Sequence, residues 1–75
     1  MKATPAIRAM LASSGKTQGE LANLPGLGLG SRQAVNVRFF RKNWSVNRLI
    51  KIATYCGYKV ILVKGDTQIT LDEEE

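Results

Sequence analysis

The spacing of apolar residues changes from helical to extended at one point in this chain, Gly57. Before Gly57, apolar residues recur three and four positions apart, which is the period of an amphipathic helix. After it, residues 58–64 and 67–71 alternate as strands do, on either side of Gly65-Asp66, a pair that suits a two-residue hairpin turn. The sequence therefore predicts a mainly α fold, with four helices followed by a C-terminal β-hairpin.

Start and stop signals mark the first two helices. Thr4-Pro5 is a helix start, with Thr4 as the capping residue, and Gly15 is the corresponding stop. Residues 17–20 (Thr-Gln-Gly-Glu) form a capping box for a short second helix, which ends before Pro25. The residues predicted to face inward from these two helices are Ile7, Met10, Leu11, Ser14, Leu21 and Leu24.

Two serines mark the starts of the remaining helices. Ser31 caps the third helix, which Lys42-Asn43 ends, and Ser45 caps the fourth, which Gly57 ends. Residues 23–31 hold three glycines at alternate positions and are predicted to form a loop. The core residues predicted here are Val35 and Phe39 in the third helix and Val46, Leu49, Ile50, Ala53 and Cys56 in the fourth.

The turn at Gly65-Asp66 predicts the register of the hairpin, in which Lys64 faces Thr67. Ile61 and Val63 then lie on one face of the hairpin without a partner in so small a chain. Because exposed β-branched residues on a hairpin with open edges favour association, we expect a homodimer interface at these two residues. The opposite face is expected to cover the helical core with Tyr58, Val60, Leu62, Ile69 and Leu71.

Length and composition exclude several classes of protein. Seventy-five residues allow one domain, which we place at residues 1–71 with the hairpin at 58–71, followed by an acidic tail at 72–75. No apolar run suits a membrane span or a signal peptide, so we expect no membrane partner and a cytoplasmic location. With no histidine and one cysteine, the chain lacks the usual ligands of a metal site and the usual general base. We therefore expect no enzyme activity, no metal and no cofactor.

Positive and negative charges are segregated along the chain. Residues 1–71 carry all eleven Lys and Arg but only Glu20 and Asp66, which gives +9 for this part and −4 for residues 72–75. A domain of this charge attracts polyanions, and nucleic acid is the leading candidate. The alternative is a soluble protein that its charge keeps monomeric.

Two strings of residues carry a family resemblance. The first is Thr17-Gln18-x-Glu20-Leu21-Ala22, and after a glycine-containing turn the second is Ser31-Arg32-Gln33-Ala34-Val35-Asn36. Two short helices joined by a turn are typical of a helix-turn-helix. Residues 4–57 resemble the lambda-repressor-like (Cro/repressor-type) helix-turn-helix family, although the turn between the two strings is longer than is usual there. The resemblance implies a small phage or bacterial transcriptional regulator that binds a palindromic site on double-stranded DNA as a homodimer.

The resemblance also implies roles for individual residues. It places Arg32, Gln33, Asn36 and Val37 against base edges in the major groove, where Arg can bind guanine, Gln can bind adenine and Val37 can meet a thymine methyl group. The expected phosphate contacts are Gln18, Ser31, Arg38, Arg41, Lys42, Asn43 and Arg48.

Other interpretations of the same residues stay open. The polar residues of the third helix can form an ordinary solvated face, and the fold can serve as a protein-interaction module, such as an inhibitor or antitoxin subunit. The glycines of residues 26–30 are expected to serve backbone turns, although their amides could also meet a phosphate. Among the aromatic residues we expect Phe39 and Trp44 in the core and Phe40 partly covered.

Overall fold

The computed structural model describes residues 3–72. In this range the predicted fold class is confirmed, since four helices precede an antiparallel two-stranded hairpin. The elements are α1 (Ala3–Ser13), the 3-10 helix η1 (Gln18–Asn23), α2 (Arg32–Arg41), α3 (Val46–Tyr55), β1 (Val60–Lys64) and β2 (Thr67–Leu71). No helix within residues 3–72 has the length and apolar character that crossing a membrane requires.

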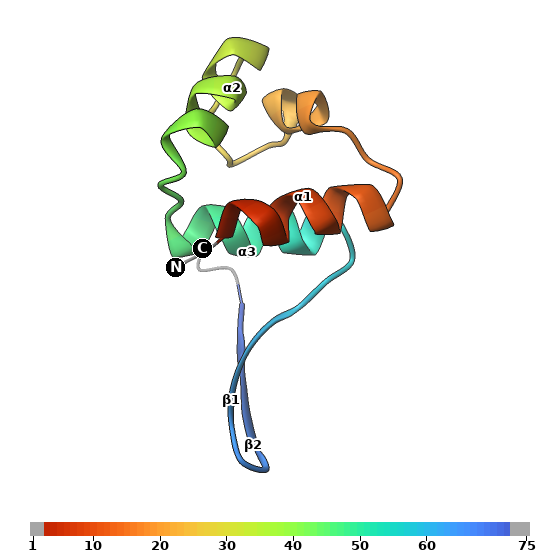
Figure 1. Cartoon of the computed structure of the whole chain (residues 1–75), viewed down its shortest axis with the longest axis vertical. Coiled ribbons are helices and arrows are strands. Elements are labelled where there is room, and N and C mark those ends of the chain that lie inside the picture. Colours follow the sequence, from red (N-terminus) through yellow and green to blue (C-terminus); the bar gives the residue numbers. More distant parts are fainter. Residues whose placement is uncertain (1–2, 73–75) are drawn as a thin grey trace.

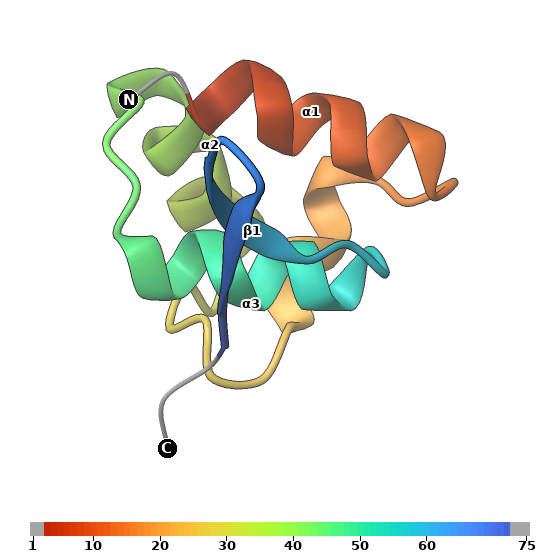
Figure 2. The same cartoon turned by 90° about the horizontal axis from the view of Figure 1, so that it is seen from below.

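The elements are stacked along the long axis of the molecule. Helices α1 and α3 lie side by side in the middle, with η1 and α2 on one side of them and the hairpin on the other (Figure 1). Seen from the hairpin end, the hairpin lies in front of α1 and α3 (Figure 2). The molecule measures 41 × 26 × 23 Å, so α2 and the hairpin turn occupy opposite ends of an elongated shape.

The hydrophobic core lies between the α1–α3 pair and the η1–α2 pair. Its cluster joins residues from every helix, and Phe39 packs edge-on against Trp44 with the ring centroids 5.0 Å apart. Leu27 and Leu29 from the glycine-containing loop are also buried, and neither was predicted to be a core residue. The core cluster consists of Ala3, Ile7, Leu11, Leu21, Leu27, Leu29, Val35, Phe39, Trp44, Ile52 and Cys56.

Two details of the predicted core are wrong. Val46 is 54% exposed, and Ile52 is fully buried. The buried residues of this segment are Ile50, Ile52, Ala53 and Cys56, with Leu49 half-buried. The buried side therefore begins after the first turn of α3, which leaves Val46 outside the core.

The serine caps are confirmed, but the Thr4 cap is wrong. Ser31 Oγ accepts a hydrogen bond from the Ala34 amide at 3.1 Å, and Ser45 Oγ accepts one from the Arg48 amide at 3.2 Å. Helix α1 already begins at Ala3, so Thr4 lies inside it with a buried side chain. Its Oγ1 accepts a hydrogen bond from Trp44 Nε1 instead.

The hairpin has the predicted register, but its predicted packing is wrong. Lys64 pairs with Thr67, and the other pairs follow in step to Val60 with Leu71. Leu62 and Ile69, expected against the core, are 53% and 56% exposed. The leucines of the 23–31 loop complete the core from the side of η1 and α2, and the hairpin extends away from the opposite side of α1 and α3. Both faces of the hairpin are therefore open to solvent over most of their length.

Candidate nucleic-acid interface

Helix α2 presents a polar and basic surface at the end of the molecule opposite the hairpin turn. Val35 and Phe39 hold its inner side in the core, and Ser31 anchors its first turn. The residues that point outward are all exposed and include no carboxylate. We call them the outer face of α2: Arg32, Gln33, Asn36, Val37, Phe40 and Arg41. This surface brings together all four residues for which the sequence predicted base contacts.

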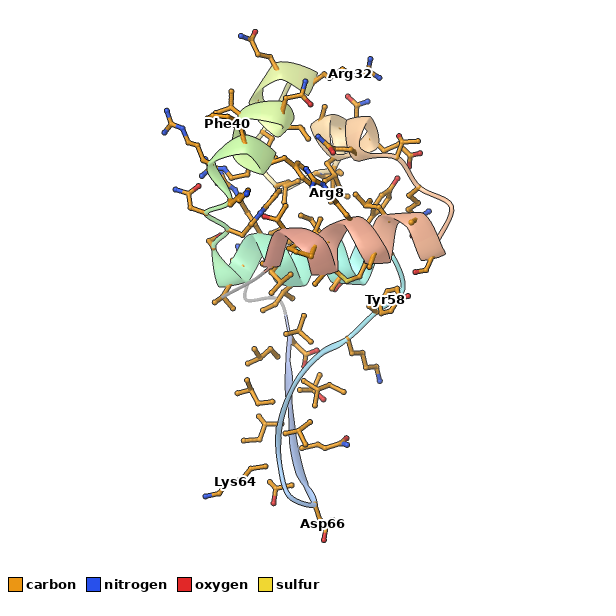
Figure 3. The ribbon with its side chains drawn as sticks, viewed as in Figure 1. Arg8, Arg32, Phe40, Tyr58, Lys64 and Asp66 are labelled. Atoms are coloured by element: carbon orange, nitrogen blue, oxygen red, sulfur yellow. The ribbon has the colours of Figure 1, made fainter. Side chains whose placement is uncertain are left out.

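Contacts with η1 hold the first turns of α2. Gln18 Nε2 donates a hydrogen bond to Asn36 Oδ1 at 3.2 Å. The Arg32 guanidinium lies over Gly19, where a β-carbon would come within 2.9 Å of Arg32 Nη2. The absence of a side chain at Gly19 therefore lets Arg32 rest against η1. Figure 3 shows Arg32 at this end of the molecule, far from Lys64 and Asp66 at the hairpin turn.

One open hollow lies along the side of α2 that faces the glycine-containing loop. It brings together three residues predicted for phosphate contacts, Ser31, Arg38 and Arg48. Arg48 Nε donates to the Leu27 carbonyl at 3.1 Å, which ties the loop to α3. The remaining lining residues are Gly28, Leu29, Gln33, Ala34 and Val37.

Arg38 and Asn43, both predicted as phosphate contacts, bind each other. Arg38 Nη1 donates to the Asn43 side-chain oxygen at 2.6 Å and to its carbonyl at 3.2 Å. Arg38 Nε is buried and has no hydrogen-bond partner among the described residues. The Arg38 guanidinium thus uses part of its hydrogen-bonding capacity to connect the end of α2 to the segment that follows it.

A second hollow lies on the other side of α2 and contains a cation that the sequence analysis missed. Arg8 of α1 lines it together with Gln18 and Lys42, and its Cζ lies 5.4 Å from the centre of the Phe39 ring. Figure 3 shows Arg8 between α1 and α2. No local sequence signal marks Arg8, because only the fold brings α1 beside α2. The remaining lining residues are Asn36, Phe39 and Phe40.

Lys42 ends α2 in an unusual backbone conformation. Its φ of 59° lies in the left-handed region, where glycine is favoured, and its amide donates to the Arg38 carbonyl. Lys42 therefore occupies the position after the helix that glycine often takes. Arg41 precedes it and is exposed outside both hollows.

The only acidic residue of residues 3–65 accepts hydrogen bonds from neighbouring residues. Glu20 accepts hydrogen bonds from Tyr55 Oη at 2.6 Å and from the Thr17 amide at 3.2 Å. These bonds, with the hydroxyl of Tyr55 as the main cause, lower the pKa of the Glu20 carboxyl. Glu20 therefore stays ionised and hydrogen-bonded to these groups. Since no other carboxylate occurs within residues 3–65, the surface around α2 is predominantly basic.

The predicted dimer residues lie elsewhere. Ile61 and Val63 are exposed on the hairpin, and Leu62 and Ile69 are exposed on its opposite face. The acidic tail, apart from Asp72, lies outside the described residues.

Comparison with known proteins gives no relative for this chain: no family model, curated protein or solved structure matches it.

Proposed function

We propose that this chain is a sequence-specific double-stranded DNA-binding protein, a small repressor-like transcriptional regulator that acts as a homodimer in the cytoplasm. The observation that carries this proposal is the outer face of α2, where Arg32, Gln33 and Asn36 stand exposed together on one helix. A B-DNA major groove is about 12 Å wide and admits an α-helix. Arginine can bind guanine O6 and N7, and glutamine or asparagine can bind adenine N6 and N7.

The two hollows beside α2 support this mode of binding. A helix in the major groove has a phosphate backbone on each side, and each hollow contributes cations on one side of α2. In this arrangement Arg38, Arg48 and Ser31 contact the phosphates of one DNA strand. Arg8, Lys42 and Gln18 contact the phosphates of the other strand. Arg41 and Asn43 complete the set of phosphate contacts that the resemblance implies.

The proposal requires no catalytic chemistry, metal or cofactor. Four of the six residues on the outer face of α2 carry amide or guanidinium groups, and these groups recognise bases by hydrogen bonding. The positive charge of residues 1–71 adds non-specific attraction to phosphate, which depends strongly on salt.

The test is selection of bound sequences from a pool of random duplexes at near-physiological salt. We expect a palindrome with half-sites about one helical turn apart. The matched control is the Arg32→Ala and Gln33→Ala double variant, which should recover no palindrome from the same pool. Salt-sensitive binding without sequence preference, for the unchanged protein, contradicts the proposal.

The exposed hairpin favours a second candidate function, a protein-interaction module such as an inhibitor or antitoxin subunit. Its apolar residues are exposed on both faces, and only Val60 and Leu71, at the end of the hairpin next to the helices, are partly buried. A homodimer interface accounts for the same surface. A protein that forms no dimer and selects no DNA sequence supports the second candidate instead.

A further inference from the structure

Phe40 is the most exposed large apolar side chain of the described residues. It is 86% exposed, although a partly covered ring was expected from the sequence. Its neighbour Phe39 turns into the core and packs on Trp44, so the core has no place for a second ring at this end of α2. The expectation was wrong because Phe39 and Phe40 point about 100° apart on the helix, and Phe39 takes the side that faces the core.

Phe40 belongs to the outer face of α2. It follows Asn36 by four residues and Gln33 by seven, so the three side chains lie on one side of the helix. At a rise of about 1.5 Å per residue, Phe40 lies roughly 10 Å beyond Gln33 along the axis. Along a duplex axis that distance spans at most about three base pairs, because a helix in the major groove lies at an angle to this axis.

The surroundings of Phe40 are basic rather than apolar. The hollow that it lines also contains Arg8 and Lys42, and Arg41 is next to it in α2. An apolar protein partner would have to desolvate these cations without a counter-charge. A DNA backbone instead supplies phosphates for the cations while bringing base edges to the helix. The charges around the ring thus favour DNA as the occupant.

We propose that Phe40 selects thymine by contact with its C5-methyl group, at a position within about three base pairs of the base read by Gln33. The thymine methyl is the apolar group that a base pair presents in the major groove, and an exposed ring covers it without needing a hydrogen bond. This inference rests on the proposed function and adds a specificity-determining residue to it.

The test uses the operator recovered by selection, with each thymine replaced in turn by deoxyuridine, which removes only the methyl group. We expect the unchanged protein to lose about fourfold in affinity per half-site at the position that Phe40 contacts, as for one buried methyl group, in addition to any loss at a thymine that Val37 contacts. Phe40→Ala should bind the thymine operator more weakly and should no longer distinguish thymine from uracil at that position. Phe40→Leu should keep part of the distinction, because its side chain still offers an apolar surface.

Val37→Ala is the matched control, since Val37 is a second exposed apolar residue of the same helix face. It should leave the thymine–uracil distinction intact at the Phe40 position. Thermal melting should show that Phe40→Ala folds as the unchanged protein does, because the ring is not packed in the core.

Four results would overturn the inference. If Phe40→Ala keeps the distinction, or if no position distinguishes thymine from uracil, Phe40 does not read the methyl group, while the recovered operator still supports the proposed function. If Phe40→Ala weakens binding to single strands more than to duplex, the ring stacks on unpaired bases instead. If no operator is recovered at all, the proposed function fails together with the inference.

Discussion

At the scale of single residues, Thr4 and Trp44 show how an interior contact overrides a local signal. The Trp44 ring nitrogen donates to Thr4 Oγ1 at 2.9 Å, although forty residues separate the two in the chain. Both side chains are buried, and a buried indole N–H needs an acceptor. A threonine next to proline is a good helix start, but the acceptor role of Thr4 depends on a partner that local sequence cannot indicate.

We expect Thr4→Val to lower the free energy of unfolding by about 1–3 kcal/mol, because it leaves the Trp44 N–H buried without an acceptor. Thr4→Ser keeps the hydroxyl and is the control, with a loss of about 1 kcal/mol for one methyl group. Urea unfolding at neutral pH measures both. Equal stability of the valine and threonine proteins would show that this hydrogen bond contributes nothing.

At the proposed DNA interface, residues that contact bases can be distinguished from residues that contact phosphates, because only the former change the preference for one DNA sequence over another. Arg32→Ala and Gln33→Ala should each cost about 1–3 kcal/mol on the selected operator and relax the preference for one base pair. Lys42→Gly should weaken binding to all duplexes alike and reduce the salt dependence by about one unit. Because glycine suits the left-handed conformation of Lys42, the same variant should also be more stable, by about 0.5–1 kcal/mol.

Fluorescence anisotropy titrations on operator and random duplexes at several salt concentrations, with urea unfolding for stability, distinguish these roles. If Arg32→Ala and Gln33→Ala lose equal amounts on both duplexes, these side chains do not read bases.

At the scale of elements, the short helix η1 depends on a contact with α3. A six-residue 3-10 helix is not stable by itself, and Glu20 connects its first turn to the end of α3 through Tyr55. Lys16 Nζ lies 4.7 Å from the centre of the Tyr55 ring and packs against the same contact. The position of η1, and therefore of Gln18 beside α2, is linked to this group of side chains.

The Glu20–Tyr55 hydrogen bond predicts a pH dependence on the acid side. The pKa of Glu20 is lowered below its ordinary value of 4.5, mainly by the Tyr55 hydroxyl. Its contribution to stability is thus complete above pH 4.5 and is lost as the pH falls through the lowered pKa. Glu20→Gln keeps the shape and hydrogen-bonding capacity but does not titrate, so its melting temperature should fall less than that of the unchanged protein on acidification.

The alkaline side gives the complementary result. The same hydrogen bond raises the pKa of Tyr55 above 10.0, so its contribution is complete below that pH and is lost as the pH rises through the raised pKa. Tyr55→Phe should therefore lose less stability than the unchanged protein in strong alkali. Melting curves across both ranges test the pair, and parallel curves for the variants and the unchanged protein would contradict it.

At the scale of the whole molecule, the elongated shape restricts how a homodimer can bind DNA. Helix α2 and the hairpin turn lie at opposite ends of the 41 Å axis. Antiparallel edge-to-edge pairing of two hairpins has a two-fold axis across the strands, which would send the two α2 helices in opposite directions. Face-to-face packing about an axis along the hairpin keeps both α2 helices on one side. In that arrangement the distance between the two α2 helices is set by the width of one molecule, which is 23–26 Å before the side chains are added. This is of the same order as the roughly 34 Å that separates two half-sites on DNA.

Substitutions on the two hairpin faces test this arrangement. Leu62 and Ile69 lie on the more apolar face, so we expect Leu62→Lys with Ile69→Lys to give a folded monomer with much weaker operator binding. The comparison variant is Ile61→Lys with Val63→Lys on the other face. A monomer from that pair alone would assign the interface to the face predicted from the sequence.

Sedimentation and thermal melting at tens of micromolar distinguish these outcomes. The pair that leaves the dimer intact should melt near the temperature of the unchanged protein, because these side chains lie outside the helical core. The monomeric pair should lose only the stabilisation that dimerisation supplies. A hairpin dimer is contradicted if the unchanged protein is a monomer or if both variants remain dimers.

Local chemistry in the sequence determined where most elements begin and end. Ser31 and Ser45 cap their helices as predicted, and the pair Gly65-Asp66 gave the observed strand register. These features depend on residues a few positions apart, whose backbone preferences are the same in any fold. The outward position of Arg32, Gln33 and Asn36 also follows from helix periodicity once Val35 and Phe39 are buried.

Only the tertiary structure decided which side chains are buried in the core and which stay exposed. Leu27 and Leu29 fill the core from a loop, so the hairpin is left to extend into solvent. Arg8 joins the α2 surface because α1 passes beside it, and Phe40 stays exposed because Phe39 takes the available space. The physical reason is that burial depends on close packing between segments distant in the chain, and a core of limited volume accepts only some of the apolar residues that local periodicity offers.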